Sequence, residues 1–153
     1  MADLGLKVLD RTVQDTNRWL RETATQLGDE DARKPAYHAL RAVLFALRDR
    51  TSADLAADFS AQLPLLVRGI FYEGYRPADQ PKDYRTLDEW NDEVRRELDQ
   101  IPADAPAPEE ATRAVFTVMS EELDWGAVRK TFTSLPEPVR TLWPGVPEEA
   151  AKD

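Results

Sequence analysis

Few side chains in this 153-residue chain could carry out catalysis. The sequence contains one histidine, His38, and no cysteine. Thiolate nucleophiles, thiolate metal sites and disulfides are therefore excluded, and any histidine base would have to be His38. Nothing in the sequence places a serine beside His38, so we interpret it as a boundary residue on a helix. Zinc needs three or four ligands, and we expect no zinc site.

Acidic residues form the second group of catalytic candidates. The run Asp29–Asp31 could attract magnesium or calcium, but the chain lacks the spacing of an EF-hand loop, and acids also suit a helix N-terminus. Glu89 and Glu93 would share a helix face, as acids on solvated helices commonly do. There is no glycine-rich phosphate loop and no G-x-S-x-G elbow. We therefore predict a protein that is not an enzyme, with no catalytic, cofactor-binding or metal-binding residues.

The remaining candidates are aromatic and arginine side chains suited to recognition. They gather in "GIFYEGYRP" at positions 69–77 and in the basic corner "RDR" at positions 48–50. Aromatic residues and arginine are enriched at protein interfaces. They serve equally well where two parts of one chain dock. Both interpretations stay open, and both select the same residues: Phe71, Tyr72, Tyr75, Arg76, Arg48 and Arg50.

Charge and hydropathy narrow the choice of partner. The formal net charge is −9, with 10 basic and 11 acidic residues in positions 1–75 but 10 and 18 in positions 76–153. This balance argues against nucleic-acid binding, which needs basic surface. The longest apolar run, Ala42–Leu47, is far shorter than the roughly 20 residues of a membrane span. The first ten residues argue against a signal peptide. We expect a cytoplasmic protein without cofactors, whose partner is an unidentified protein or a second copy.

Helical periodicity runs through the whole chain. Apolar residues step by three and four from Leu6 to Leu27, and Gly28 provides a stop. Thr51–Asp54 resembles a capping box at the start of a third helix, and Thr86–Glu89 matches one fully at the start of a fifth. We expect eight helices and no strand, which is an all-α fold.

The sequence also contains an internal repeat. "QLPLLVRGIF" from residue 62 and "SLPEPVRTLW" from residue 134 share Leu-Pro and Val-Arg at an offset of 72, and matches extend back to Ala39 and Ala111. Arg41 and Arg68 recur as Arg113 and Arg140, and we interpret all four as structural arginines that bind carboxylates or helix ends. Because one repeat cannot cover its own apolar face, two would pack together. We predict two tandem related four-helix units that pack into one helical body and form one compact domain. The first unit would span residues 1–76, a linker 77–85, the second unit 86–145 and a frayed tail 146–153.

The segment Tyr37–Pro77 resembles the signature of the bacterial domain-of-unknown-function family 2267. The similar features are "RAVL" followed by "LRDR", the "QLP" break, and the "GIFYEGYRP" ending. The resemblance spans about residues 17–145. It implies an all-α fold of two related helical units in a small bacterial protein. It implies no activity, and the second copy departs from the pattern at Ser120–Trp125.

Two functional hypotheses follow. The first is a non-catalytic protein-interaction or regulatory module that binds another protein or a second copy through an apolar surface. The alternative is a sensor of a small molecule or stress signal, with a pocket between the two helical units. An exposed apolar patch would favour the first, and a cavity of about 300 Å³ with converging polar groups would favour the second. Two titratable residues with opposed pKa shifts in such a cavity would indicate catalysis instead.

Overall fold

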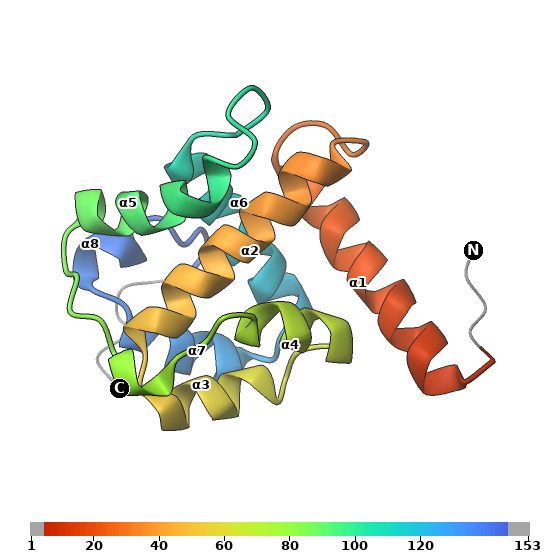
Figure 1. Cartoon of the computed structure of the whole chain (residues 1–153), viewed down its shortest axis with the longest axis horizontal. Coiled ribbons are helices and arrows are strands. Elements are labelled where there is room, and N and C mark those ends of the chain that lie inside the picture. Colours follow the sequence, from red (N-terminus) through yellow and green to blue (C-terminus); the bar gives the residue numbers. More distant parts are fainter. Residues whose placement is uncertain (1–4, 147–153) are drawn as a thin grey trace.

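The computed structural model describes residues 5–146, and within them the protein is all helical, as predicted (Figure 1). The first two helices are long, and a short 3₁₀ helix lies between α4 and α5. The frayed tail predicted for residues 146–153 lies outside the described residues except for Val146. The α-helices are α1 (Lys7–Gln26), α2 (Arg33–Arg50), α3 (Ala53–Ser60), α4 (Leu65–Tyr72), α5 (Leu87–Leu98), α6 (Pro108–Glu122), α7 (Trp125–Ser134) and α8 (Glu137–Arg140).

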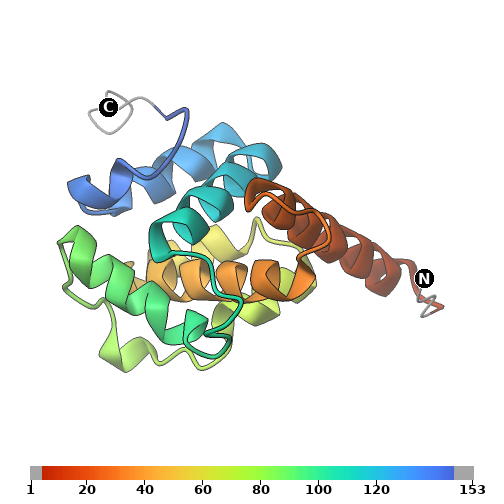
Figure 2. The ribbon, with the colours of Figure 1, turned by 90° about the horizontal axis from the view of Figure 1, so that it is seen from above.

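Helix α2 is the central element of the fold. It contacts α1, α4, α5 and α6, and in Figures 1 and 2 it runs through the middle of the molecule. Nearly all of its residues from Ala39 to Asp49 are buried, with Arg41 and Phe45 only half-buried. A helix that is apolar on most sides belongs in a protein interior, and this one is surrounded by neighbours.

One hydrophobic core crosses the boundary between the two predicted units. Its largest side chains include Trp19 and Phe71 from the first half of the chain and Trp90, Phe116 and Trp143 from the second. Phe116 and Trp143 stack with their ring centroids 4.2 Å apart. The two halves therefore share a core, while their description as two four-helix units stays a prediction.

Two arginines that lie 72 residues apart make matching contacts. Arg68 donates from Nε to the carbonyl of Ser60 at 2.9 Å, and Arg140 donates from Nε to the carbonyl of Phe132 at 3.2 Å. Ser60 and Phe132 are themselves 72 residues apart. Each arginine thus binds the C-terminal end of the helix that precedes its Leu-Pro break, where backbone carbonyls lack helical partners.

The sequence located one helix start correctly and missed another by one residue. At α5, Thr86 Oγ1 accepts from the backbone of Glu89, and Glu89 Oε1 accepts from the backbone of Thr86, both at 3.1 Å. At α3 the N-cap is Ser52, not Thr51, because Ser52 Oγ accepts from the Leu55 amide. Thr51 Oγ1 instead donates to the Arg48 carbonyl at the end of α2, so its hydroxyl is committed to the other helix.

Candidate functional site

Four of the six residues selected from the sequence meet where α2 and α4 end. Arg48 is buried and donates from Nη1 to the carbonyls of Phe71 and Glu73, at 3.0 and 2.7 Å. Its guanidinium also lies 5.4 Å from the ring centroid of Tyr75. Tyr72 shares a hydrogen bond of 2.8 Å with Ser60. Arg48 therefore binds the C-terminal end of α4, and these side chains join α4 to α2 and α3.

The other two selected residues lie elsewhere. Arg50 donates from Nε to the Tyr84 carbonyl at 2.8 Å, in the link between α4 and α5. Arg76 is exposed and forms an ion pair with Asp79 at 3.3 Å. The hydroxyl of Tyr75 is buried without a hydrogen-bond partner, and desolvation raises its pKa. Neither arginine contributes to a cluster with the aromatic residues.

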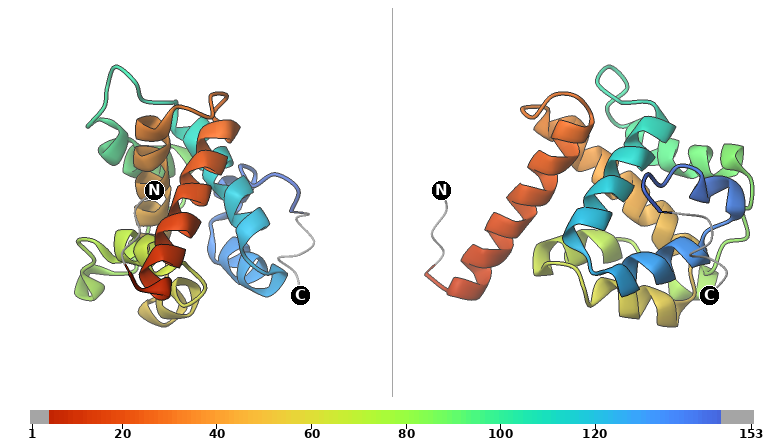
Figure 3. Two further views of the ribbon diagram at one scale, coloured as in Figure 1. Left: turned by 90° about the vertical axis from the view of Figure 1, so that its right-hand side faces the viewer. Right: turned by 180° about the vertical axis from the view of Figure 1, so that it is seen from behind.

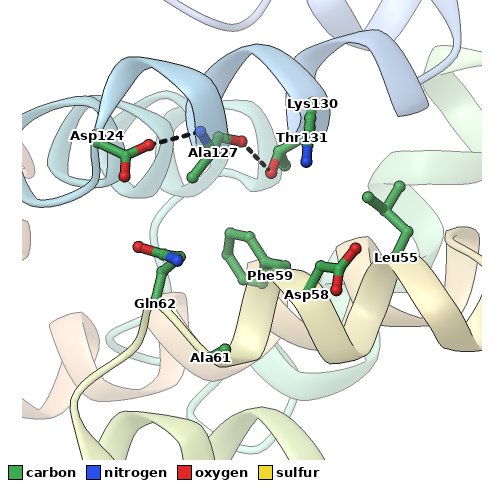
Figure 4. Close-up of a pocket in the computed structure, with 9 residues that line it drawn as sticks. All are labelled: Leu55, Asp58, Phe59, Ala61, Gln62, Asp124, Ala127, Lys130 and Thr131. Carbon is green, nitrogen blue, oxygen red and sulfur yellow. Dashed lines mark hydrogen bonds between the residues drawn. The ribbon is translucent and has the colours of Figure 1, made fainter.

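A groove of about 380 Å³ lies between α3 and α7, one helix from each half of the chain (Figure 4). Both helices begin at a side-chain cap, Ser52 for α3 and Asp124 for α7, which fixes the start of each wall. The lining is apolar at its base and polar at its edges. The residues that line it are Leu55, Asp58, Phe59, Ala61, Gln62, Asp124, Ala127, Lys130 and Thr131.

Three polar side chains at the edge of the groove have no partner among the described residues. Asp58 and Gln62 lie on the α3 side and Lys130 on the α7 side, and in Figure 4 they extend into the space between the two helices. Asp124 Oδ1 accepts from the Ala127 amide at 2.8 Å, and its other oxygen is not used by this cap. The α3 side of the groove thus carries a negative charge and the α7 side carries both signs, at Asp124 and Lys130.

A recess at the base of the groove reaches Phe71, one of the residues selected from the sequence. A small recess of about 10 Å³ shares Leu55, Phe59 and Thr131 with the groove and extends to Phe71. Phe71 packs against Phe59, with ring centroids 5.4 Å apart. The aromatic segment therefore supports the groove from behind, although it does not line it.

Sequence reasoning missed the groove because its residues are ordinary helix-surface types. The internal offset could have indicated it: Leu55, Asp58 and Phe59 lie 72 residues before Ala127, Lys130 and Thr131. Residues 72 positions apart on α3 and α7 thus line one space. The same alignment pairs the caps Ser52 and Asp124.

A separate charged cluster joins α2 to α5. His38 Nδ1 lies 2.7 Å from Glu97 Oε2, and Arg41 donates from Nε to the same oxygen at 3.1 Å. Glu97 is only 6% exposed and His38 16% exposed. Arg41 also pairs with Glu73 beyond the end of α4. The cluster agrees with the interpretation of Arg41 as an arginine that binds carboxylates.

A second charged cluster joins α1 to α6. Arg18 donates from Nη2 and Nε to Glu122, at 2.7 and 3.0 Å, and this hydrogen bonding lowers the pKa of Glu122. Burial beside Glu122 raises the pKa of Glu22 to about 7. The two carboxyl groups therefore have opposed pKa shifts, but the depression beside Glu22 is open to solvent and lies away from the groove. No group of three or more histidine, cysteine or acidic side chains within residues 5–146 is arranged to hold a metal ion.

Four exposed apolar side chains lie near the starts of α1 and α4. Leu6 and Val8 are 58% and 63% exposed, and Leu65 and Leu66 are also exposed. The Leu66 amide donates to Thr12 Oγ1 at 2.9 Å, which brings the start of α4 against the first turns of α1. In Figures 1 and 3 those turns project from the rest of the molecule. We call these four side chains the α1–α4 apolar surface.

The fold and these surfaces define an all-helical protein with a single core and a groove between its halves. Within the described part of the chain, no helix is both long enough and apolar enough to cross a lipid bilayer. A profile of the DUF2267 family of uncharacterized conserved proteins matches residues 16–142, so the protein belongs to this family. No curated protein matches the sequence. The function has to be argued from the geometry of the chain itself.

Proposed function

We propose that the protein is a non-catalytic regulatory module that binds a small amphipathic ligand in the groove between α3 and α7. The observation that carries this proposal is the set of unpartnered polar side chains, Asp58, Gln62 and Lys130, placed around an apolar base. A volume of about 380 Å³ falls in the range of small-molecule sites. Because the groove is partly open, a ligand could exchange with solvent, as a sensor requires.

The lining favours a ligand that carries both charges and an apolar body. A cationic nitrogen would be attracted by the carboxylates of Asp58 and Asp124, and a carboxylate by the ammonium group of Lys130. The apolar body would cover Leu55 and Phe59 and remove part of their surface from water. Free apolar amino acids and short peptides have this chemistry.

The contrast with the charged clusters supports a role without catalysis. The two pairs of side chains that resemble acid–base pairs, His38 with Glu97 and Glu22 with Glu122, both lie outside the groove. A general acid or base must reach its substrate within hydrogen-bond distance. A ligand held between α3 and α7 would contact neither pair.

The proposal is tested by thermal unfolding of the full chain with the free amino acids and a set of apolar dipeptides. A ligand at ten times its Kd should add about 1.4 kcal/mol of stability, which raises Tm by about 3–6 °C in a domain of this size. Asp58→Asn and Lys130→Gln should abolish the shift. Asp104→Asn and Lys7→Gln, which change exposed residues outside the groove, should retain it. Shifts that survive both groove substitutions would refute the proposal.

A second function is favoured by the α1–α4 apolar surface. Its exposed leucine and valine side chains, near the starts of two helices that pack together, would suit a protein partner or a second copy. Light scattering of the purified chain, with crosslinking in a native lysate, tests this function. Leu66→Ser should lower the measured mass or remove the crosslinked partner, whereas Leu66→Ser without effect on either would argue against it.

A further inference from the structure

The pairing of His38 with Glu97 holds the imidazole ring in one chemical form. Glu97 is buried, and its carboxylate accepts from Arg41 at Oε2 and from Gln100 at Oε1, at 3.1 and 3.2 Å. Because the Glu97 carboxylate already accepts from these two donors, it acts here as a hydrogen-bond acceptor. The contact of 2.7 Å with His38 Nδ1 therefore requires that Nδ1 carry the proton.

This assignment leaves the lone pair of the neutral ring on Nε2. Nε2 has no hydrogen-bond partner among the described residues and is not among their fully buried atoms, although the His38 side chain as a whole is only 16% exposed. The ring is also held at its edge by Tyr37, with centroids 5.3 Å apart and nearly perpendicular planes. His38 thus presents an oriented nitrogen nucleophile whose developing positive charge Glu97 can stabilise.

We propose that Nε2 of His38 is a phosphoryl acceptor, a modification site by which a partner protein regulates this module. The Nε2 lone pair forms a bond to phosphorus as the bond from phosphorus to the leaving group breaks, and the leaving group departs with that electron pair. Nδ1 keeps its proton, and the resulting imidazolium remains bound to the Glu97 carboxylate. The donor is a protein that carries a phosphohistidine or an acyl phosphate.

The surroundings of His38 favour a protein-borne donor over a small substrate. His38 lines none of the depressions described above, so a small substrate would have no cavity beside the ring, whose side chain is 16% exposed. Lys34 is exposed one helical turn earlier, where its ammonium can approach a phosphoryl group on His38. Arg41, one turn later, holds the carboxylates of Glu97 and Glu73 that would otherwise repel the group.

The test uses phosphoramidate as the donor and the full-length protein. Because His38 is the only histidine, every phosphohistidine signal reports on this residue. Phosphoramidate transfers its phosphoryl group and releases ammonia, so no other reagent is required. We expect one phosphoryl group by intact mass, located on Nε2 alone by ³¹P NMR, and formed faster than on N-acetylhistidine under the same conditions.

Glu97→Gln tests the positioning role of the carboxylate. An amide can donate as well as accept, so it no longer fixes the tautomer, and we expect a rate about tenfold lower and a mixture of Nε2 and Nδ1 products. Glu110→Gln, an exposed glutamate on α6, should behave as the unsubstituted protein. Circular dichroism establishes that each variant is folded. If Glu97→Gln does not fold, the proposal is still tested by the unsubstituted protein, through the position of its phosphoryl group and the rate at which that group is added.

Three outcomes would overturn the proposal. The first is a product on Nδ1 in the unsubstituted protein. The second is a rate at or below that of N-acetylhistidine, which would show that the surroundings of His38 give it no advantage as a nucleophile. The third is a folded Glu97→Gln variant that keeps both the original rate and the single isomer, which would show that the carboxylate has only a structural role.

Discussion

The carboxyl group of Glu22 makes the stability of the protein depend on pH. Glu22 Oε2 is buried without a hydrogen-bond partner, close to a Glu122 carboxylate that is already bound by Arg18. Burial, followed by the proximity of Glu122, raises the pKa of Glu22 from 4.5 to about 7. When Glu22 is protonated, it can donate to Glu122; when it is ionised, the two carboxylates repel each other across the α1–α6 contact.

The sign of the effect follows from the raised pKa. Between about pH 4.5 and 7 the folded protein holds a proton on Glu22 that the unfolded chain has lost, so stability falls as pH rises through this range. A shift of that size corresponds to at most about 3 kcal/mol. Because Glu22 is half-buried and solvent screens its charge, we expect about 1 kcal/mol.

Glu22→Gln removes this ionisation and keeps a side chain that can donate to Glu122. The variant should be about 1 kcal/mol more stable than the unsubstituted protein at pH 8 and equally stable at pH 4.5, as measured by urea unfolding with tryptophan fluorescence. Glu30→Gln, which removes an exposed acid from the same depression, should produce no such difference. A Glu22→Gln variant whose stability difference is the same at both pH values would refute the reasoning.

Three other predictions concern stability and ionisation. Arg48→Met should cost about 3 kcal/mol in urea unfolding, because it leaves the Phe71 carbonyl and the Asp49 carboxylate without their buried donor. Arg68→Met and Arg140→Met should each cost about 1–2 kcal/mol, because each removes two hydrogen bonds to backbone carbonyls near a Leu-Pro break. Desolvation raises the pKa of Tyr84 well above its usual value, so in an ultraviolet pH titration one of the four tyrosines should stay un-ionised until the protein unfolds.

Much of the fold could be predicted because the local patterns are strong. The helix predicted from the spacing between Leu6 and Leu27, the stop at Gly28 and the capping box at Thr86 all depend on residues close together in sequence. The face of α1 that is buried was not the predicted stripe, since Leu6 is exposed and Trp19 is buried. The false capping box at Thr51 shows the limit of this reasoning. Two adjacent hydroxyl residues could each cap α3, and the choice depended on the Arg48 carbonyl at the end of the preceding helix.

The charged clusters could not be predicted because their members are far apart in sequence. His38 and Glu97 are separated by 59 positions, and Arg18 and Glu122 by 104. Each is an unremarkable residue on an amphipathic helix, and only the packing of α2 on α5 and of α1 on α6 brings the pairs together. Arg48 was selected as a recognition residue by its type, but its position inside the core is a consequence of how α4 ends against α2.

Positions that lie 72 residues apart in the two halves of the chain carry different side chains at several contacts. Arg48 and Ser120 lie 72 residues apart, and so do Phe71 and Trp143. Arg48 donates to the Phe71 carbonyl, and Ser120 Oγ accepts from Trp143 Nε1 at 2.7 Å. A hydrogen bond therefore joins each pair, although its donor is the arginine in the first pair and the tryptophan in the second. At the groove, Asp58 faces the side that carries Lys130, its own counterpart, and neither has a partner. Asp124 at the start of α7 adds a second acid, so the α7 wall carries both an acid and a base opposite Asp58. An acid and a base that face each other would orient a ligand with separated charges, which is the chemistry of the ligand proposed for the groove.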